Sequence, residues 1–163
     1  MQIQVDSREK ARAITKIICE FQKQEVKHFI SKMYIGDYCN LHNPLVLIDR
    51  KQNITEIAGN ATEPRKNVEI DGKILRLNRF EKELYRLKKI GGKMFILIEQ
   101  DKIDGKKIET LEDVILWENK HGTVQGDRIY RILKSWQNKH NIEYVFCAKR
   151  DTGKRIIELL RGD

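Results

Sequence analysis

Hydrophobic and polar positions along the chain follow two periods, which predict an alternation of strands and helices. Ile3 and Val5 alternate with polar neighbours, so a first strand is predicted to end at Asp6. Further strands are predicted where apolar residues alternate or run continuously, over residues 28–38, 45–51, 94–99 and 144–148. Helices are predicted where apolar residues recur at helical spacing, over residues 11–24, 53–58, 77–87, 111–117, 129–136 and from 152 onward.

This order of elements predicts an α/β fold, a sandwich around a mixed sheet with one antiparallel hairpin. The length of 163 residues suits one domain, so we expect residues 1–163 to form a single unit. Residues 60–73, which contain Pro64 and Gly72, are predicted to be a loop or small excursion. Four element ends are predicted from local signals: helix caps at Asn53 and Asp127, a helix stop at Gly91-Gly92 and a turn at Asp104-Gly105.

The predicted hairpin brings two carboxylates and an ammonium to one surface of the sheet. If it centres near Asn43, Asp37 lies opposite Asp49, because both are six residues from that centre. Cross-strand partners have Cβ atoms roughly 4.5–5.5 Å apart. Side chains alternate along a strand, so Lys51 shares the face of Asp49 and Arg50 points to the other face.

Such a group suits a magnesium-dependent phosphodiesterase. Two carboxylates supply the oxygen ligands that Mg²⁺ prefers and leave positions for water and a phosphate oxygen, and Mn²⁺ is expected to substitute. A nearby lysine polarises the attacking water or offsets charge on the pentavalent phosphate. Acids beside a lysine at a strand end also arise as ordinary solvated surface charge, so this pattern needs further support.

The charge balance favours a polyanionic partner. Lys and Arg total 32 against 24 acids, giving net +8, which suits DNA, although solubility alone also explains basic proteins. No apolar run approaches the ~18 residues of a membrane span, and the N-terminus lacks the pattern of a signal peptide. Three scattered cysteines are expected to be reduced thiols of a cytoplasmic protein.

Several motifs together resemble the XPF-type (ERCC family) structure-specific nucleases of the restriction-endonuclease-like PD-(D/E)XK superfamily. In chain order they are Val5-Asp6-Ser7-Arg8-Glu9, Gly36-Asp37-Tyr38, Asp49-Arg50-Lys51 and the run from Arg79 to Glu99 that ends Phe-Ile-Leu-Ile-Glu. The resemblance covers nearly the whole chain. It implies a restriction-endonuclease-like three-layer sandwich in which the antiparallel hairpin carries the active site.

The resemblance also implies roles for individual residues. The implied metal ligands are Asp6, Asp37 and Asp49, and the implied catalytic set is Asp37, Asp49, Lys51 and Arg50. Lys51 would activate water or neutralise phosphate, whereas Arg50 would form an architectural ion pair or contact a nearby phosphate. Arg79 matches a family arginine expected to face the scissile strand, and Arg8, Arg65 and Lys66 are expected to contact DNA as well. Glu99 is expected to hold a helix or an arginine.

Three departures from the family pattern matter. Asp49 stands where the family has Glu, and Thr55 stands at the family's downstream acid, with Glu56 one position later. Glu56 either substitutes for that acid or is surface charge, and Glu20 is either an extra ligand or, on the more favoured interpretation, surface charge. No helix-hairpin-helix module is expected in residues 1–163, so DNA positioning is expected from the domain's own surface, a homodimer or an accessory DNA-binding protein.

The predicted function is therefore a Mg²⁺-dependent endonuclease acting at branched DNA such as flaps, forks or junctions. The resemblance implies products with 5′-phosphate and 3′-hydroxyl ends, in repair, recombination or phage DNA processing, within the cytoplasm of a bacterial or phage-infected cell. Two alternatives stay open: a non-catalytic DNA-binding subunit of a nuclease heterodimer, and a Holliday-junction resolvase of the same superfold.

Overall fold

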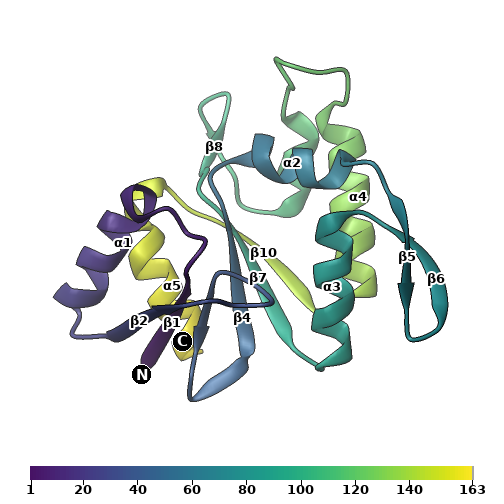
Figure 1. The fold of residues 1–163 in the computed structure, drawn as a ribbon. Helices are drawn as coiled ribbons and strands as arrows, with labels where there is room; N and C mark the ends of the chain where they lie inside the picture. The colour runs from purple at the N-terminus through teal and green to yellow at the C-terminus, as the bar shows by residue number, and fades with distance from the viewer. Residues whose placement is uncertain (163) are drawn as a thin grey trace.

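One mixed six-stranded sheet runs through the computed structural model, which describes residues 1–162 (Figure 1). Its strands, in sheet order, are β10 (Ile142–Phe146), β7 (Lys93–Ile98), β4 (Asn43–Lys51), β3 (Tyr38–Asn40), β1 (Gln2–Asp6) and β2 (Lys27–Ser31). The pairs β10–β7, β7–β4 and β1–β2 are parallel, whereas β3 is antiparallel to both of its neighbours. The predicted α/β fold with a mixed central sheet is confirmed.

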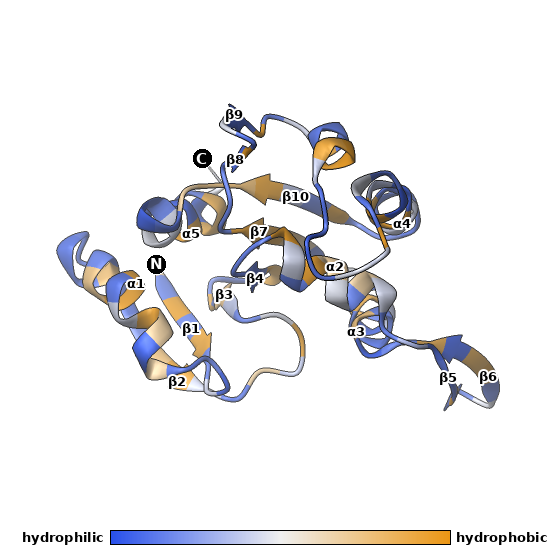
Figure 2. Ribbon diagram, turned by 90° about the horizontal axis from the view of Figure 1, so that it is seen from above, coloured by the Kyte–Doolittle hydropathy of each residue, from blue (hydrophilic) through white to orange (hydrophobic). Residues whose placement is uncertain are grey.

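Helices cover both faces of this sheet. Side chains of β7 alternate between two buried clusters, with Met94, Ile96 and Ile98 in one and Phe95 and Leu97 in the other. The first cluster is closed by α2 (Ile54–Thr62), α3 (Arg79–Lys89) and α4 (Gly126–Lys139), and the second by α1 (Ala11–Lys23) and α5 (Thr152–Arg161) (Figure 2). None of the helices in residues 1–162 is long and apolar enough to cross a membrane.

The β3–β4 hairpin brings Asp37 opposite Asp49 as predicted, but its turn is not centred at Asn43. Asn40 pairs with Asn43, so the turn lies at residues 41–42, and the register shifts between Cys39 and Asn40. Tyr38 pairs with Ile48 and Cys39 with Leu47, so the same register places Asp37 opposite Asp49. The Asp37 amide donates to the Ile48 carbonyl at 2.7 Å, which extends this pairing by one residue. The hairpin therefore holds the two aspartates together by backbone hydrogen bonds.

The prediction of one long strand over residues 28–38 was wrong. Residues 27–31 form β2, which pairs with β1 at the edge of the sheet, and only β3 pairs with β4. Gly36 interrupts the run because its φ of 68° lies in the left-handed region. An added Cβ there would lie 3.0 Å from the Ile48 carbonyl oxygen, so this close approach of backbones requires glycine.

Residues 60–73 were predicted as a loop, yet most of them belong to a two-stranded ribbon. This ribbon joins β5 (Lys66–Ile70) to β6 (Lys73–Leu77) and extends beyond α3 and α4 in Figures 1 and 2. Asp71 and Gly72 both have positive φ, the geometry that an Asp-Gly hairpin turn adopts. The predicted Asp104-Gly105 turn has the same geometry and joins β8 (Lys102–Ile103) to β9 (Lys106–Lys107).

Helix ends agree with the sequence in part. Asn53 caps α2 as predicted, since its side chain accepts from the Glu56 amide at 2.9 Å, and Gly91 follows α3 with positive φ. The cap of α4 is Gln125, and Asp127 lies in the first turn instead, so that prediction was wrong. The segment predicted as a helix over 111–117 is a 3₁₀ helix, η1 (Leu111–Leu116), and a second, η2 (Lys149–Asp151), precedes α5.

Candidate active site

A cavity of about 650 Å³ lies where β1 and β4 end, beside the first turns of α2 and α3. Seven residues singled out from the sequence line it: Arg8, Asp37, Asp49, Arg50, Lys51, Glu56 and Arg79. The β3–β4 register supplies Asp37 and Asp49, and strand alternation supplies Lys51. Chain segments far apart in sequence therefore meet at one site.

Asp49 and Lys51 form a buried ion pair in this cavity. Lys51 Nζ lies 2.7 Å from Asp49 Oδ1 and 4.7 Å from the centre of the Phe80 ring. Burial works to lower the pKa of Lys51, but the Asp49 carboxylate outweighs it, so that pKa is raised and the ammonium stays charged at neutral pH. No donor among residues 1–162 has hydrogen-bond geometry at Asp49 Oδ1, which leaves this buried oxygen with the ion pair alone.

Asp37 lies beside Asp49, and a backbone amide of β4 fixes its carboxylate. Its Oδ2 accepts from the Arg50 amide at 2.8 Å. Burial, and then the carboxylates of Asp49 and Glu9, raise the pKa of Asp37 well above its ordinary value. The pKa of Asp49 is also raised, chiefly by burial. Ionising these carboxylates therefore carries a free-energy cost, which a bound cation would offset.

This cost predicts a stabilising substitution. In metal-free protein at pH 8, Asp37→Asn is expected to increase the free energy of unfolding by about 1–3 kcal/mol, since the amide keeps the Arg50 contact without the charge. The pKa of Asp37 is higher in the folded state than its value of about 3.9 in the unfolded state. This difference stabilises the wild-type fold below about pH 3.9, and the stabilisation is lost as pH rises through the pKa of the folded state. The gap between the two proteins should therefore narrow towards pH 4.

Denaturant unfolding in EDTA at pH 8 and near pH 4.5 measures this gap. Glu69, an exposed carboxylate on β5, offers a matched control. Glu69→Gln should change the free energy of unfolding by less than about 0.5 kcal/mol at both pH values. An Asp37→Asn protein less stable than wild type at pH 8 would show that the charge of Asp37 does not destabilise the metal-free fold.

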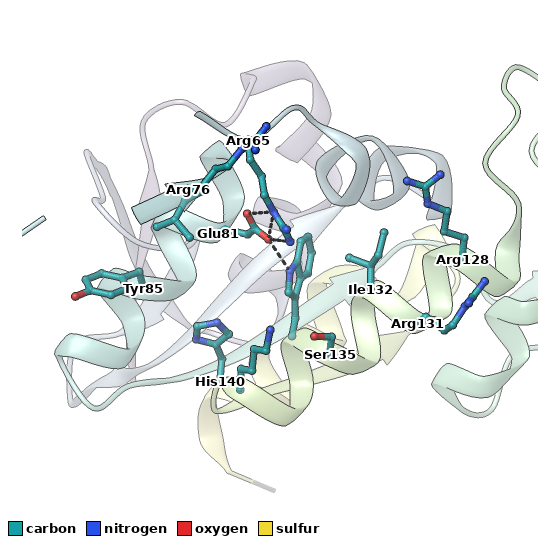
Figure 3. A pocket seen from close by; sticks show the side chains of 12 residues that line it. Arg65, Arg76, Glu81, Tyr85, Arg128, Arg131, Ile132, Ser135 and His140 are labelled. Carbon is teal, nitrogen blue, oxygen red and sulfur yellow. Dashed lines mark hydrogen bonds and ion pairs between the residues drawn. The ribbon is translucent and has the colours of Figure 1, made fainter. Parts of the chain in front are cut away.

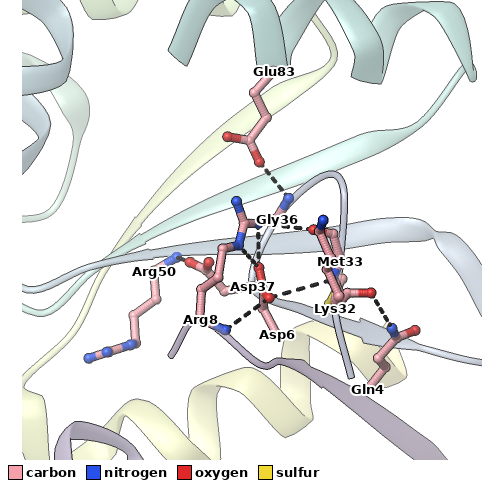
Figure 4. A network of polar contacts seen from close by, with 9 residues as sticks. All are labelled: Gln4, Asp6, Arg8, Lys32, Met33, Gly36, Asp37, Arg50 and Glu83. Carbon is pink, nitrogen blue, oxygen red and sulfur yellow. Dashed lines mark hydrogen bonds and ion pairs between the residues drawn. The ribbon is translucent and has the colours of Figure 1, made fainter. Parts of the chain in front are cut away.

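Glu83 is a cavity residue that the sequence analysis missed. Its Oε1 accepts from the Gly36 amide at 2.6 Å, so α3 is tied to the turn that carries Asp37 (Figure 4). Burial, and then the Asp49 carboxylate, raise the pKa of Glu83. The signal was present in the sequence, since Glu83 lies four residues after Arg79 and hence on the same helix face.

Asp6 is not among the residues that line the cavity. Its buried carboxylate accepts from Arg8 Nε at 2.7 Å and from the Arg8 and Met33 amides (Figure 4). Burial works to raise the pKa of Asp6, but the hydrogen bonds from Arg8 outweigh it and lower that pKa. Asp6 thereby orients Arg8, whose side chain is 64% exposed at the cavity wall. A metal-binding role for Asp6 stays a prediction.

Arg50 has the surroundings of an architectural residue. Its guanidinium contacts Glu9 at 2.8 Å and Glu99 at 3.2 Å, and its side chain is only 4% exposed. Glu9 also accepts from the Tyr38 hydroxyl, and Glu99 from Thr152 Oγ1 at the start of α5, both at 2.8 Å. Arg50 thus joins β4 to the β1–α1 turn and to α5, and Glu99 holds both an arginine and a helix, as expected.

The other predicted residues lie in three different places. Arg79 is 81% exposed at the rim of the cavity, and Glu56 lines the cavity while accepting from the Gln52 amide at 2.7 Å. Glu20 accepts from Gln24 on α1 and packs against Gly153 of α5, outside the cavity lining. Lys66 is exposed on β5, and Arg65 forms a bidentate ion pair with Glu81.

The donor set in the cavity fits a hard divalent cation. Within residues 1–162, no three Asp, Glu, His or Cys side chains lie close enough to hold a metal ion by themselves. Mg²⁺ does not need such a cage, since it is usually bound through one or two carboxylates and keeps several waters. The weakly satisfied Asp49 Oδ1 and the raised pKa values of Asp37 and Asp49 are what such a pair shows before a cation binds.

Comparisons with known proteins agree with this geometry. Two solved structures of similar fold are XPF from Aeropyrum pernix, with TM-score 0.66 and 15% identity, and that protein in complex with DNA, with TM-score 0.65 and 17% identity. They are matched over 99% and 98% of this chain, which spans only 66% and 63% of theirs. No curated protein matches the sequence at a significant level. The family model of the ERCC4 domain matches residues 5–160, so this chain belongs to the ERCC4 family of XPF-type nuclease domains that its motifs resemble.

Proposed function

We propose that this chain is a Mg²⁺-dependent DNA endonuclease that hydrolyses one strand at branched DNA such as flaps, forks or junctions. The observation that carries the proposal is the meeting of Asp37, Asp49 and Lys51 in one cavity of about 650 Å³. Membership of the ERCC4 family, which includes metal-dependent nucleases, supports the reaction class. The DNA in the complex of the Aeropyrum pernix XPF, together with the net charge of +8, supports DNA as the substrate.

In this proposal Asp37 and Asp49 hold the cation, which when bound would supply Lewis-acid polarisation of the phosphodiester. Lys51, whose ammonium lies 2.7 Å from Asp49, would stabilise negative charge on the phosphate oxygens or polarise the attacking water. Water adds to phosphorus and the bond to the 3′ oxygen breaks, leaving a 5′-phosphate and a 3′-hydroxyl.

The cavity walls are suited to hold the strand that is cut. Arg8, Arg79 and Arg86 line the cavity with exposed side chains. Asp6 and the Met33 carbonyl orient the Arg8 guanidinium, and all three guanidiniums are placed to bind phosphates on either side of the scissile bond. Tyr34 also lines the cavity with 76% of its surface exposed, which suits stacking on a base that leaves the duplex.

A substrate panel tests this proposal. Oligonucleotides of equal length should be presented as a flap, a fork, a four-way junction, a linear duplex and a single strand, with Mg²⁺, Mn²⁺ or EDTA. Branched substrates are expected to be cut at least about 10-fold faster than linear duplex, which corresponds to roughly 1.4 kcal/mol of discrimination. EDTA should abolish cutting, and Mn²⁺ should support it.

Two outcomes of the panel would contradict the proposal. Binding of branched DNA without cleavage in either metal would assign the chain to the non-catalytic DNA-binding subunits. Cleavage confined to the four-way junction would identify a Holliday-junction resolvase. Ligation of the products with a ligase that requires a 5′-phosphate and a 3′-hydroxyl distinguishes the predicted ends from 5′-hydroxyl and 3′-phosphate ends.

A further inference from the structure

A second cavity lies between α3 and α4, and none of the proposed catalytic or metal-binding residues lines it. Its volume is about 520 Å³, and the foot of the β5–β6 ribbon closes one end (Figure 3). The indole of Trp136 forms part of its wall and is almost wholly buried. We call this cavity the α3–α4 groove.

The α3–α4 groove is strongly cationic. Five basic side chains line it: Arg65, Arg76, Arg128, Arg131 and Lys139. The single carboxylate in its lining, Glu81, is already engaged, since it accepts from Arg65 at 2.6 Å and 2.9 Å and from the Asn78 amide. Arg131 also contacts Asp127, but that pair is exposed and therefore weak. The excess positive charge suits a ligand with several phosphates.

Aromatic rings stand among these cations. Tyr85 on α3 and His140 at the end of α4 both line the α3–α4 groove (Figure 3), and Trp136 of α4 lines it as well. Burial, and then Lys88 and Lys139, lower the pKa of His140, so its ring is neutral at pH 7. The Nδ1 of His140 is buried without a partner among residues 1–162. Rings beside arginines are the elements by which proteins stack unpaired bases.

Helix α3 alone separates this groove from the candidate active site. Glu81 and Tyr85 face the groove, whereas Phe80 and Glu83 face the active-site cavity. An α-helix with its side chains is about 10–12 Å across, which a strand spans with roughly three nucleotides. A strand leaving the active site across α3 therefore reaches the groove directly.

We propose that the α3–α4 groove binds the unpaired single-stranded arm of the DNA substrate. The inference rests on the proposed function, because it assigns one arm of a branched DNA to the groove while the scissile strand lies in the active-site cavity. A cavity of this volume belongs to the size class of small-ligand sites, so it takes roughly one or two nucleotides and no duplex. The groove would thus select branched DNA over linear duplex.

Fluorescence anisotropy with a 20-nucleotide oligo(dT), a flap and a nicked duplex tests this inference without requiring cleavage. Arg128→Glu/Arg131→Glu is expected to weaken oligo(dT) and flap binding at least about 10-fold, with a smaller change for nicked duplex. The negative slope of log affinity against log salt for oligo(dT) should become shallower by about 1.4, the value for two lost phosphate contacts. Tyr85→Ala, which keeps the charge, should weaken oligo(dT) about 5-fold or more.

Arg12→Glu/Lys16→Glu on α1 is the matched control, since it reverses two exposed charges on the opposite side of the sheet. It should change oligo(dT) affinity less than about twofold. Equal losses for the control and groove variants, unchanged oligo(dT) affinity in the groove variants, or absence of single-strand binding by wild type would each overturn the inference. Cleavage by wild type is scored separately, so a protein that binds the arm but cuts nothing refutes only the proposed function.

Discussion

Asp49→Asn is expected to reduce Mg²⁺-dependent cleavage by on the order of 10³-fold while leaving DNA affinity within about twofold of wild type. Asparagine keeps the size of the side chain but removes one of the two carboxylates proposed to hold the cation, the one paired with Lys51. Loss of an outer hydrogen-bond partner of a metal ligand typically costs 10–100-fold, and loss of the ligand itself should cost more. DNA affinity depends mainly on phosphate contacts from arginine and lysine, which this variant retains.

Three measurements make this test specific. Single-turnover cleavage of a flap gives the loss of rate, anisotropy in EDTA gives DNA affinity, and the rise of melting temperature with Mn²⁺ reports metal binding directly. Wild type should be stabilised by Mn²⁺, and Asp49→Asn should not. Glu143→Gln on β10 removes an exposed carboxylate outside the cavity lining and should behave as wild type in all three. An Asp49→Asn protein that cuts as fast as wild type would remove the proposed mechanism.

The part of the site formed by the β3–β4 hairpin could be predicted from the sequence because its geometry is local. Turn formers mark the hairpin, and pairing about Asn43 places Asp37 opposite Asp49. The structure reaches this pairing through a turn at residues 41–42 and a register shift between Cys39 and Asn40, which the sequence did not indicate. Strand alternation then places Lys51 beside Asp49. Contacts between distant elements were not accessible in this way: Glu83 reaches Gly36 across 47 positions, and this depends on how α3 packs on the sheet.

The fold shows the same division between local and tertiary information. The apolar run of β7 and the cap at Asn53 follow from local rules, and the structure confirms both. The division of residues 28–38 into β2 and β3 depends on Gly36, whose positive φ is selected by the approach to the Ile48 carbonyl. The β5–β6 ribbon did carry local signals, the Asp71-Gly72 turn and the alternation of Val68 with Ile70 and of Leu75 with Leu77. Its strands are short and only half-bury these side chains, so the signal is weak.

Arg50→Met is expected to lower the free energy of unfolding by about 3–5 kcal/mol. Methionine fills much of the arginine's volume but leaves Glu9 and Glu99 near the core without their cation. Breaking a buried ion pair from one side costs this much because the remaining charges stay desolvated. A domain of this size has a total stability of roughly 5–15 kcal/mol, so the loss is a large share of it. Arg12→Met, at an exposed position on α1, should change stability by less than about 0.5 kcal/mol.

Rescue separates the architectural role of Arg50 from a catalytic one. Adding Glu9→Gln and Glu99→Gln to Arg50→Met removes the unpaired charges, so most of the lost stability should return in denaturant unfolding. If Arg50 acts only by joining β4 to Glu9 and Glu99, the stabilised triple variant should also recover cleavage to within about 10-fold of wild type, measured below its melting temperature. A triple variant that is stable but inactive would place the guanidinium on a phosphate of the substrate. An Arg50→Met protein as stable as wild type would show that the three-residue network does not hold the sheet to its helices.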